Sequence, residues 1–318
     1  MLSHPKKKGY FHSMKNSIGI IGMGWVGASV AISILQRGIC RELLLNDVRD
    51  EIAEGEAMDL NHGTSFFPSA DVRASSIEDM CDCRAIVVTA GRGGSGEETR
   101  LQLLKDNIGI AKSISEKLKG YEGILIVVAN PVDVLTYFYQ KFTGMPAHRV
   151  IGTGTLLDTT RLREAIANRL NLEPKTIHAQ VIGEHGDSEV VLWSKAFIGG
   201  VPLRDWKGWK SSYEKEIEEE VRTAAYEIIK RKGATNHAIG LVTAELLFWI
   251  FRGERRVVTL CSVIDGAYGF KGVALSLPVV ISENGVEKVV ETLLLEKEER
   301  ALNNSASIIQ NAINSASL

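Results

Sequence analysis

Residues 17–38 read SIGIIGMGWVGASVAISILQRG and contain the pattern that decides the fold. The short apolar run at 18–21 is rich in β-branched side chains, which predicts a buried strand. Residues 28–35 then read as a helix, and Gly38 follows as its stop signal. A glycine-rich turn at 22–27 therefore lies between a strand and a helix.

The three glycines of this turn are Gly22, Gly24 and Gly27. The first lets the chain turn tightly off the strand, the second lets the backbone approach a pyrophosphate, and the third lets the helix pack closely on the sheet. The helix start also directs unpaired N–H groups at phosphates. A second apolar run, at 43–45, ends near Asp47, which lies about 20 residues beyond Gly27. A carboxylate at this spacing can accept hydrogen bonds from the ribose of NAD and repel the extra phosphate of NADP. The pattern predicts NAD binding in preference to a plain tight turn.

The composition is that of a globular protein: 318 residues, 45% hydrophobic and 24% charged, enough for two domains. A net charge of −2 gives no general attraction for nucleic acid or anionic lipid, and no apolar run is long enough to span a membrane. Four cysteines lack the paired spacing of a metal site, so we expect reduced thiols, no metal and a cytoplasmic location. They are Cys40, Cys81, Cys83 and Cys261.

Strand and helix patterns alternate over residues 17–152, which predicts an α/β fold with a doubly wound parallel (Rossmann) sheet. The runs at 85–90 and 124–129 are continuously apolar, as in strands covered on both faces, and 101–118 has helical spacing. Residues 16–152 are therefore the expected dinucleotide-binding domain. Ligands of such sheets bind beyond the carboxyl ends of the strands.

The pattern becomes mixed after residue 152, and residues 153–318 are the expected α+β substrate domain. Helices are predicted over 156–170, 213–230, 238–251 and 297–312, and strands over 177–182, 190–193, 257–264 and 273–281. Residues 1–15 read as a disordered arm, in which Met14 is an alternative start to Met1.

Candidate chemistry starts at His185, in a glycine-flanked turn, because imidazole gives and takes a proton near neutral pH. A lone histidine is more often structural. Asp158 and Arg161 are one helical step apart and share a face, either as a surface ion pair or as functional groups. An aspartate can orient a histidine ring, and the planar fork of an arginine can bind a carboxylate.

Two further segments follow predicted strands. The glycine-rich loop at 91–100 ends in Arg100 at a helix start and is either a lid or a disordered loop. Asn130 ends the strand at 124–129 and either faces the cofactor or caps the next helix.

Taken together, these motifs resemble the lactate/malate dehydrogenase family, especially its lactate-dehydrogenase-like members, from about residue 17 to the C-terminus. The matching motifs are GMGWVG at 22–27, Asp47, MDLNHG at 58–63, NPVD at 130–133, GTGTLLD at 152–158 and GEHGDS at 183–188. Their joint presence in this order is far more specific than any one motif.

The resemblance implies an NAD-dependent L-lactate dehydrogenase of the cytoplasm and of glycolysis, a homodimer or homotetramer, that transfers a hydride between NADH and pyruvate. In it His185 is the acid/base, Asp158 its partner, and Arg161 the group that binds the substrate carboxylate. Arg100 polarises the carbonyl, Asn130 hydrogen-bonds near the substrate oxygen and Thr235 lines the pocket. The implied cofactor contacts are Gly22, Gly24, Trp25, Val26, Gly27, Asp47, Ala90, Gly91 and Asn130.

One position departs from the family. Gly94 stands where lactate-type members have Gln and malate-type members Arg. Oxaloacetate would bring a second carboxylate without a partner, at a cost of roughly several kcal/mol, and Arg92 would reach it only after a shift of the loop. Pyruvate is therefore expected first, bulkier 2-oxo acids of the hydroxyisocaproate type second, and oxaloacetate third.

Other readings remain at this point. His178 and Arg163 lie where some relatives bind fructose 1,6-bisphosphate. A non-catalytic dinucleotide-binding protein would keep the glycine turn without the chemistry. An NAD- and metal-dependent glycosidase would need a cysteine beside Asn130, and Ala129 stands there.

Overall fold

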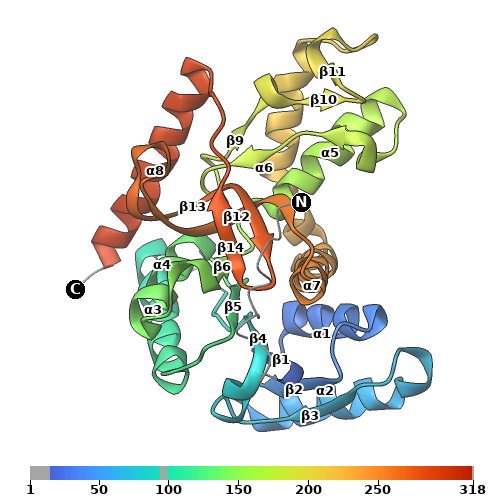
Figure 1. The fold of residues 1–318 in the computed structure, drawn as a ribbon, viewed down its shortest axis with the longest axis vertical. Helices are drawn as coiled ribbons and strands as arrows, with labels where there is room; N and C mark the ends of the chain where they lie inside the picture. Colours follow the sequence, from blue (N-terminus) through green and yellow to red (C-terminus); the bar gives the residue numbers. More distant parts are fainter. Residues whose placement is uncertain (1–14, 94–98, 317–318) are drawn as a thin grey trace, which may run out of the picture.

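Six parallel strands from the first half of the chain form one part of a large central sheet (Figure 1). They are β1 (Lys15–Ile21), β2 (Glu42–Asn46), β3 (Asp71–Ala74), β4 (Cys83–Val88), β5 (Ile124–Val127) and β6 (Val150–Gly152). Their order in the sheet is β3-β2-β1-β4-β5-β6. This is the doubly wound Rossmann arrangement, so the predicted fold class is confirmed. The computed structural model describes residues 15–93 and 99–316.

Antiparallel strands from the second half of the chain extend the same sheet. They are β12 (Arg256–Asp265), β13 (Lys271–Ser282) and β14 (Gly285–Val289). The two parts join where Cys261 of β12 pairs with Gly152 of β6. The full order is β14-β13-β12-β6-β5-β4-β1-β2-β3.

Helices cover both faces of this sheet. On one face lie α3 (Arg100–Lys117), α4 (Val132–Thr143) and α8 (Glu296–Ala316), and on the other lie α1 (Trp25–Arg37), α2 (Asp50–His62) and α7 (His237–Arg252). Alternate residues of β4 enter the two cores, Ile86 on the first face and Val87 on the second. A strand buried on both faces explains why its sequence is continuously apolar.

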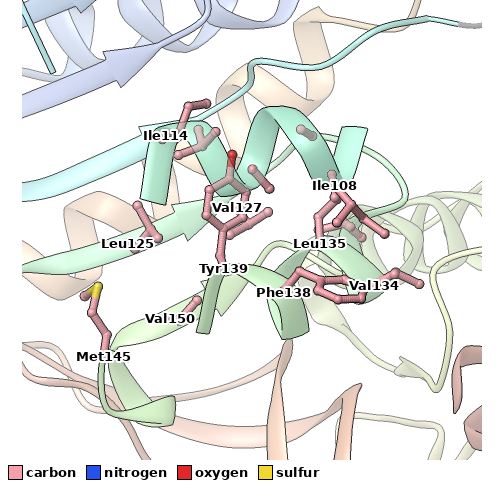
Figure 2. Packing of buried hydrophobic residues seen from close by; sticks show 14 of the residues in the cluster. Ile108, Ile114, Leu125, Val127, Val134, Leu135, Phe138, Tyr139, Met145 and Val150 are labelled. Atoms are coloured by element: carbon pink, nitrogen blue, oxygen red, sulfur yellow. The ribbon is translucent and has the colours of Figure 1, made fainter. Parts of the chain in front are cut away.

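The first of these cores is dense between α3, α4 and the middle of the sheet. Figure 2 shows Phe138 and Tyr139 of α4 packed with Leu125 and Val127 of β5. All four side chains are at most 3% exposed. This packing fixes the position of α4, whose first turn faces the candidate site.

The remaining elements pack beside the sheet around a third core. They are the helices α5 (Leu156–Leu170) and α6 (Ser212–Lys232), and the short strands β7 (Ile177–His178), β8 (Val181–Ile182), β9 (Val190–Val191), β10 (Phe197–Ile198) and β11 (Val201–Pro202). Short 3₁₀ helices lie at Thr64–Phe66, Asp79–Asp82, Ala147–Arg149, Pro174–Thr176, Trp193–Lys195, Leu203–Asp205 and Ala267–Gly269.

Two predicted strands differ from the structure. The strand expected at 177–182 is two strands in different sheets, because β7 pairs with β10 whereas β8 pairs with β9. Between them the carbonyl of Ala179 accepts a hydrogen bond from the Arg163 side chain (3.1 Å) instead of continuing a ladder. The strand expected at 190–193 ends at Val191, because a 3₁₀ helix begins at Trp193.

Three parts of the segments named above lie outside the described ranges: residues 1–14 of the expected arm, residues 94–98 of the glycine-rich loop, which include Gly94, and residues 317–318. Lys15 belongs to β1. Within residues 15–93 and 99–316, no helix is both long and apolar enough to cross a membrane. The same ranges contain no cluster of three or more His, Cys, Asp and Glu side chains suited to a metal ion.

Candidate active site

The glycine turn at 22–27 is shaped by two of its three glycines. Gly22 has a φ of 100°, and a Cβ there would lie 2.6 Å from the backbone nitrogen of Ala90. A Cβ on Gly27 would lie 2.0 Å from the carbonyl oxygen of Gly22. Gly24, by contrast, has no protein atom within 4 Å of an added Cβ. The protein itself therefore does not require glycine at 24, which fits a backbone left bare for a bound group.

Asp47 closes this turn from the end of β2. Its Oδ2 accepts a hydrogen bond from the backbone of Met23 (2.8 Å), and its Oδ1 accepts one from Arg49 (3.1 Å). Helix α1 begins at Trp25 with no side chain capping its free N–H groups. An uncapped helix start, bare backbone at Gly24 and a fixed carboxylate suit the pyrophosphate and ribose of NAD.

His185, Asp158 and Arg161 form one connected group. His185 Nδ1 lies 2.6 Å from Asp158 Oδ2, and Arg161 donates from Nη1 to Asp158 Oδ1 at 2.8 Å. Helix α5 carries both the aspartate and the arginine, three residues apart, so they share its face as predicted. The Asp158 carboxylate is 2% exposed. A buried acid between two cations is not the weak surface ion pair that the sequence alone allowed.

The loop that carries His185 is held at three consecutive residues by three different elements. Gly183 pairs through both backbone groups with Ser276 of β13 (2.8 and 3.1 Å). The backbone of Glu184 donates to Ser305 Oγ of α8 at 2.6 Å. The backbone of His185 itself donates to Asp133 Oδ2 of α4 at 2.7 Å. The imidazole therefore projects from a main chain with little freedom to shift.

The charges around His185 favour its protonated form. Burial would lower the pKa of His185, but the adjacent Asp158 carboxylate, together with the charge of Asp133, outweighs burial and raises that pKa to about 9. Burial would likewise raise the pKa of Asp158, but His185 and Arg161 bring it below its usual value. At neutral pH the pair is therefore an imidazolium beside a carboxylate, with Nδ1 engaged and Nε2 the ring nitrogen left for a substrate.

A further acid stands close by. Burial and the charge of Asp158 raise the pKa of Glu189 to about 8, so this side chain is neutral at pH 7. Its Oε1 is buried without a hydrogen-bond partner among the residues that the structure describes. Asp158 is thus the charged acid of this pair at neutral pH.

The other predicted residues lie around this group. Arg100 is exposed at the start of α3, where its charge acts on Tyr226 of α6, and it makes none of the hydrogen bonds of His185 or Asp158 described above. Asn130 Oδ1 accepts from the backbone of Val132, the first residue of α4, at 3.3 Å, whereas the N-cap position of α4 is Pro131. Thr235 lies half-buried in the loop before α7.

The cofactor side of the site borders that loop. Asn236, next to Thr235, donates from its side chain to Ser29 Oγ of α1 at 2.8 Å. Ala90 and Gly91 follow β4, and the backbone of Ala90 donates to the carbonyl of Ile21 at 2.9 Å. Trp25 is 61% exposed at the start of α1. These contacts bring the predicted cofactor residues to the carboxyl ends of β1, β2 and β4.

Some residues of the site were not singled out from the sequence. Asp133 is part of the NPVD motif, and its position just after a predicted strand is the sequence signal that could have identified it as a residue of the site. Ser276 and Ser305 had no local signal, because Ser276 is 93 residues from its partner Gly183 and Ser305 is 121 residues from its partner Glu184. Only the folded sheet brings them together.

Comparison with known proteins agrees with this geometry. Residues 16–152 match the NAD binding domain of the lactate/malate dehydrogenase family, and residues 155–317 match its alpha/beta C-terminal domain. The L-lactate dehydrogenase of Fervidobacterium nodosum is 48% identical over 306 residues, covering 93% of this chain and 97% of that protein. That of Geobacillus kaustophilus is 41% identical over 305 residues, covering 94% and 96%.

Two solved structures are similar over nearly their whole length. A lactate dehydrogenase from a Medee basin deep-sea metagenome library superposes with a TM-score of 0.93 at 39% identity, covering 96% of this chain and 100% of that one. The minor L-lactate dehydrogenase from Enterococcus mundtii gives a TM-score of 0.93 at 35% identity, covering 96% and 99%. The matched domains, the relatives and the site geometry agree: this chain belongs to the lactate/malate dehydrogenase family.

Proposed function

We propose that this protein is an NAD-dependent L-lactate dehydrogenase that reduces pyruvate reversibly. The observation that carries the proposal is the connected group of His185, Asp158 and Arg161, which offers a proton donor and a carboxylate-binding guanidinium in one place. The relatives named L-lactate dehydrogenase, at 41–48% identity over more than 90% of the chain, support the same activity. The glycine turn and Asp47 would hold the cofactor.

The mechanism follows from the protonation state of His185. NADH, when bound, supplies a hydride to the carbonyl carbon of the 2-oxo acid. His185 donates the proton on Nε2 to the carbonyl oxygen, because Nδ1 is occupied by Asp158. Asp158 stabilises the charged ring before the transfer. In the reverse direction neutral His185 accepts the proton of the hydroxyl group.

Two guanidinium groups complete the proposed site. Arg161 would bind the substrate carboxylate with its planar fork while keeping its bond to Asp158. Arg100, at the end of the loop that we propose as a lid, would stabilise the negative charge that develops on the carbonyl oxygen once water is excluded. Thr235 would line the pocket, and Asn130 would hydrogen-bond near the substrate oxygen.

For the substrate we propose pyruvate first, bulkier 2-oxo acids second and oxaloacetate third. A glycine at 94 has no side chain to pair with a second carboxylate. Arg92, the nearest basic residue of the loop, forms an ion pair with Asp106 of α3, and its backbone donates to Asn107 Oδ1 at 2.7 Å. These contacts occupy Arg92 and count against oxaloacetate.

The test is NADH oxidation, followed by absorbance, with pyruvate, oxaloacetate, phenylpyruvate and 2-oxoisocaproate side by side. We expect the highest kcat/KM with pyruvate. His185→Asn should abolish turnover and leave NADH binding nearly intact; equal loss of both would refute the acid/base role. NADH binding without turnover on any of the four acids would favour a non-catalytic protein, and manganese-dependent sugar hydrolysis would favour a glycosidase.

We also propose a symmetric homodimer or homotetramer in the cytoplasm, with a role in glycolysis. Large apolar side chains are exposed on and near α1, α2 and α7, which supports burial against a second copy. They are Ile32, Met58, Phe66 and Leu241. Cys40 and Cys261 are buried free thiols, which supports a reducing compartment. Sedimentation analysis checks the subunit count, and a monomer at micromolar concentration would contradict it.

A regulatory site is a separate proposal. Arg163, His178 and Lys195 line one pocket beside β7 and β10, and three basic groups suit a sugar bisphosphate such as fructose 1,6-bisphosphate. Arg163 Nε already donates to the carbonyl of Ala179, which orients the guanidinium. Adding the bisphosphate should lower the KM for pyruvate; an unchanged KM would dismiss this site.

A further inference from the structure

Asp133 occupies an unusual position beneath the candidate site. It lies in the first turn of α4 and is 3% exposed. One carboxylate oxygen, Oδ2, accepts the hydrogen bond from the backbone of His185 at 2.7 Å. The other, Oδ1, is buried and accepts no hydrogen bond from an N–H or O–H group in the part of the chain that the structure describes. A buried acid that is only half-satisfied is costly, so a purely structural role explains it poorly.

Three groups stabilise the charge of this carboxylate against its burial: the backbone N–H of His185, the thiol of Cys261 and the ring of His185. The thiol of Cys261 on β12 is fully buried and faces both Asp133 and the hydroxyl of Thr136. Thr136 donates its own proton to the carbonyl of Val132 at 2.7 Å. The cation that acts on Asp133 is His185, whose ring and backbone both favour the ionised acid.

We propose that Asp133 is a positioning residue for proton transfer, which fixes the main chain of His185 and, through its charge, helps to set the pH at which the imidazole loses its proton. This inference rests on the proposed function of His185 as acid/base. It adds a second buried carboxylate to that function: Asp158 acts on the ring directly, whereas Asp133 acts from behind the peptide that carries the ring.

The charges facing His185 give the direction of the effect. On α5, Asp158 favours the imidazolium form of His185 and Arg161 opposes it. On α4, Asp133 favours the imidazolium. Glu189, before β9, is neutral at pH 7 because its pKa is raised to about 8, but it is mostly ionised by pH 9 and then also attracts the imidazolium. Glu184 adds a negative charge near Asp133. Burial raises the pKa of Asp133 to about 6, so Asp133 is ionised across the range in which His185 titrates.

Removing this charge should therefore make His185 easier to deprotonate. Asp133→Asn keeps an oxygen that can accept the His185 backbone N–H but removes the negative charge. We expect the upper pKa of the pH profile of kcat/KM for pyruvate to fall by about 0.5–1 pH unit. Asp133→Ala removes the acceptor as well, and kcat should fall a further ~10-fold with the KM for NADH unchanged.

The matched control is Glu298→Gln. Glu298 is also a buried carboxylate that accepts backbone N–H groups, from Ser194 and Leu295 at 3.0 Å each, but it is not among the charges that act on His185. This variant should lower the melting temperature without moving the upper pKa. An equal shift in this control would mean that loss of any buried acid perturbs the site, and would overturn the proposal.

A second measurement is independent of turnover. In protein labelled with [13C]histidine, the His185 resonance, assigned with His185→Asn, should titrate near pH 9 in the wild type and show a smaller inflection near pH 6 from Asp133. The inflection should vanish in Asp133→Asn. A wild-type resonance with no inflection near pH 6, or a folded Asp133→Asn protein with the wild-type upper pKa, refutes the proposal. Wild-type protein that oxidises no NADH with any 2-oxo acid would refute the proposed function instead, since the titration needs no substrate.

Discussion

Replacing Asp158 with asparagine should shift the pH dependence of pyruvate reduction by more than any other single substitution at the site. In the structure the Asp158 carboxylate, 2.6 Å from the ring, makes the largest contribution that raises the pKa of His185, and with the help of Asp133 it holds that pKa at about 9 against burial. An isolated histidine has a pKa of about 6.5, so the difference of roughly 2.5 pH units corresponds to about 3 kcal/mol. Without the carboxylate, burial remains and Arg161 still repels the imidazolium while only Asp133 favours it, so the pKa should fall to about the ordinary value of 6.5.

The expected loss of activity follows from the protonated fraction of His185. At pH 8 that fraction falls from about nine tenths, for a pKa of 9, to about 3%, for a pKa of 6.5, so pyruvate reduction should slow by about 30-fold. At pH 5.5 the loss should be much smaller, because the ring is protonated in both proteins. The assay is kcat/KM for pyruvate at saturating NADH from pH 5.5 to 9.5. Glu245→Gln, which breaks an exposed ion pair with Arg37, is the control. An Asp158→Asn protein whose activity is reduced equally at all pH values would refute this reasoning.

Three further outcomes can be checked with simple variants or conditions. Gly27→Ala should lower the melting temperature strongly, because its Cβ would lie 2.0 Å from a carbonyl oxygen. Gly24→Ala should melt like the wild type but bind NADH more weakly in a fluorescence titration. The opposite pattern would exchange the roles assigned to the two glycines. Arg161→Lys should raise the KM for pyruvate about 100-fold, since an ammonium lacks the planar fork, and an unchanged KM would exclude it from carboxylate binding. The free energy of unfolding should fall by up to about 3 kcal/mol as the pH rises from 6.5 to 9.5. The pKa of His185 is about 6.5 in the unfolded chain and about 9 in the folded protein, so its stabilising contribution is complete below pH 6.5 and is lost as the pH rises past 9. Urea titrations should show this pH dependence in the wild type but not in His185→Asn.

Features that depend on neighbours in sequence were predictable. The glycine turn joins β1 to α1 as expected, because strand, turn and helix follow one another within about twenty residues. Helix α5 begins and ends where it was predicted, at Leu156–Leu170, and Asn171 ends it in a left-handed conformation with a φ of 53°. The shared face of Asp158 and Arg161 followed from helical geometry alone.

Features that depend on tertiary pairing were not predictable. Strand β3 is four residues long and has one fully buried side chain, Val72, so its sequence has no periodic pattern to detect. The split of 177–182 into β7 and β8 depends on partners at Phe197 and Val190, which no local pattern identifies. The hydrogen bond from His185 to Asp133 crosses 52 residues, so the role of that acid emerged only with the fold.

The junction of β6 with β12 has a consequence for exchanging parts between homologues. A Cβ on Gly152 would lie 2.4 Å from Thr136 Oγ1 and 3.0 Å from Cys261 Cβ, so the three residues fit only as a set. A chimaera spliced at residue 152 would take Thr136 and Gly152 from one parent and Cys261 from the other. Such hybrids should fold well only when both parents have matching side-chain volumes at this seam, however similar they are elsewhere.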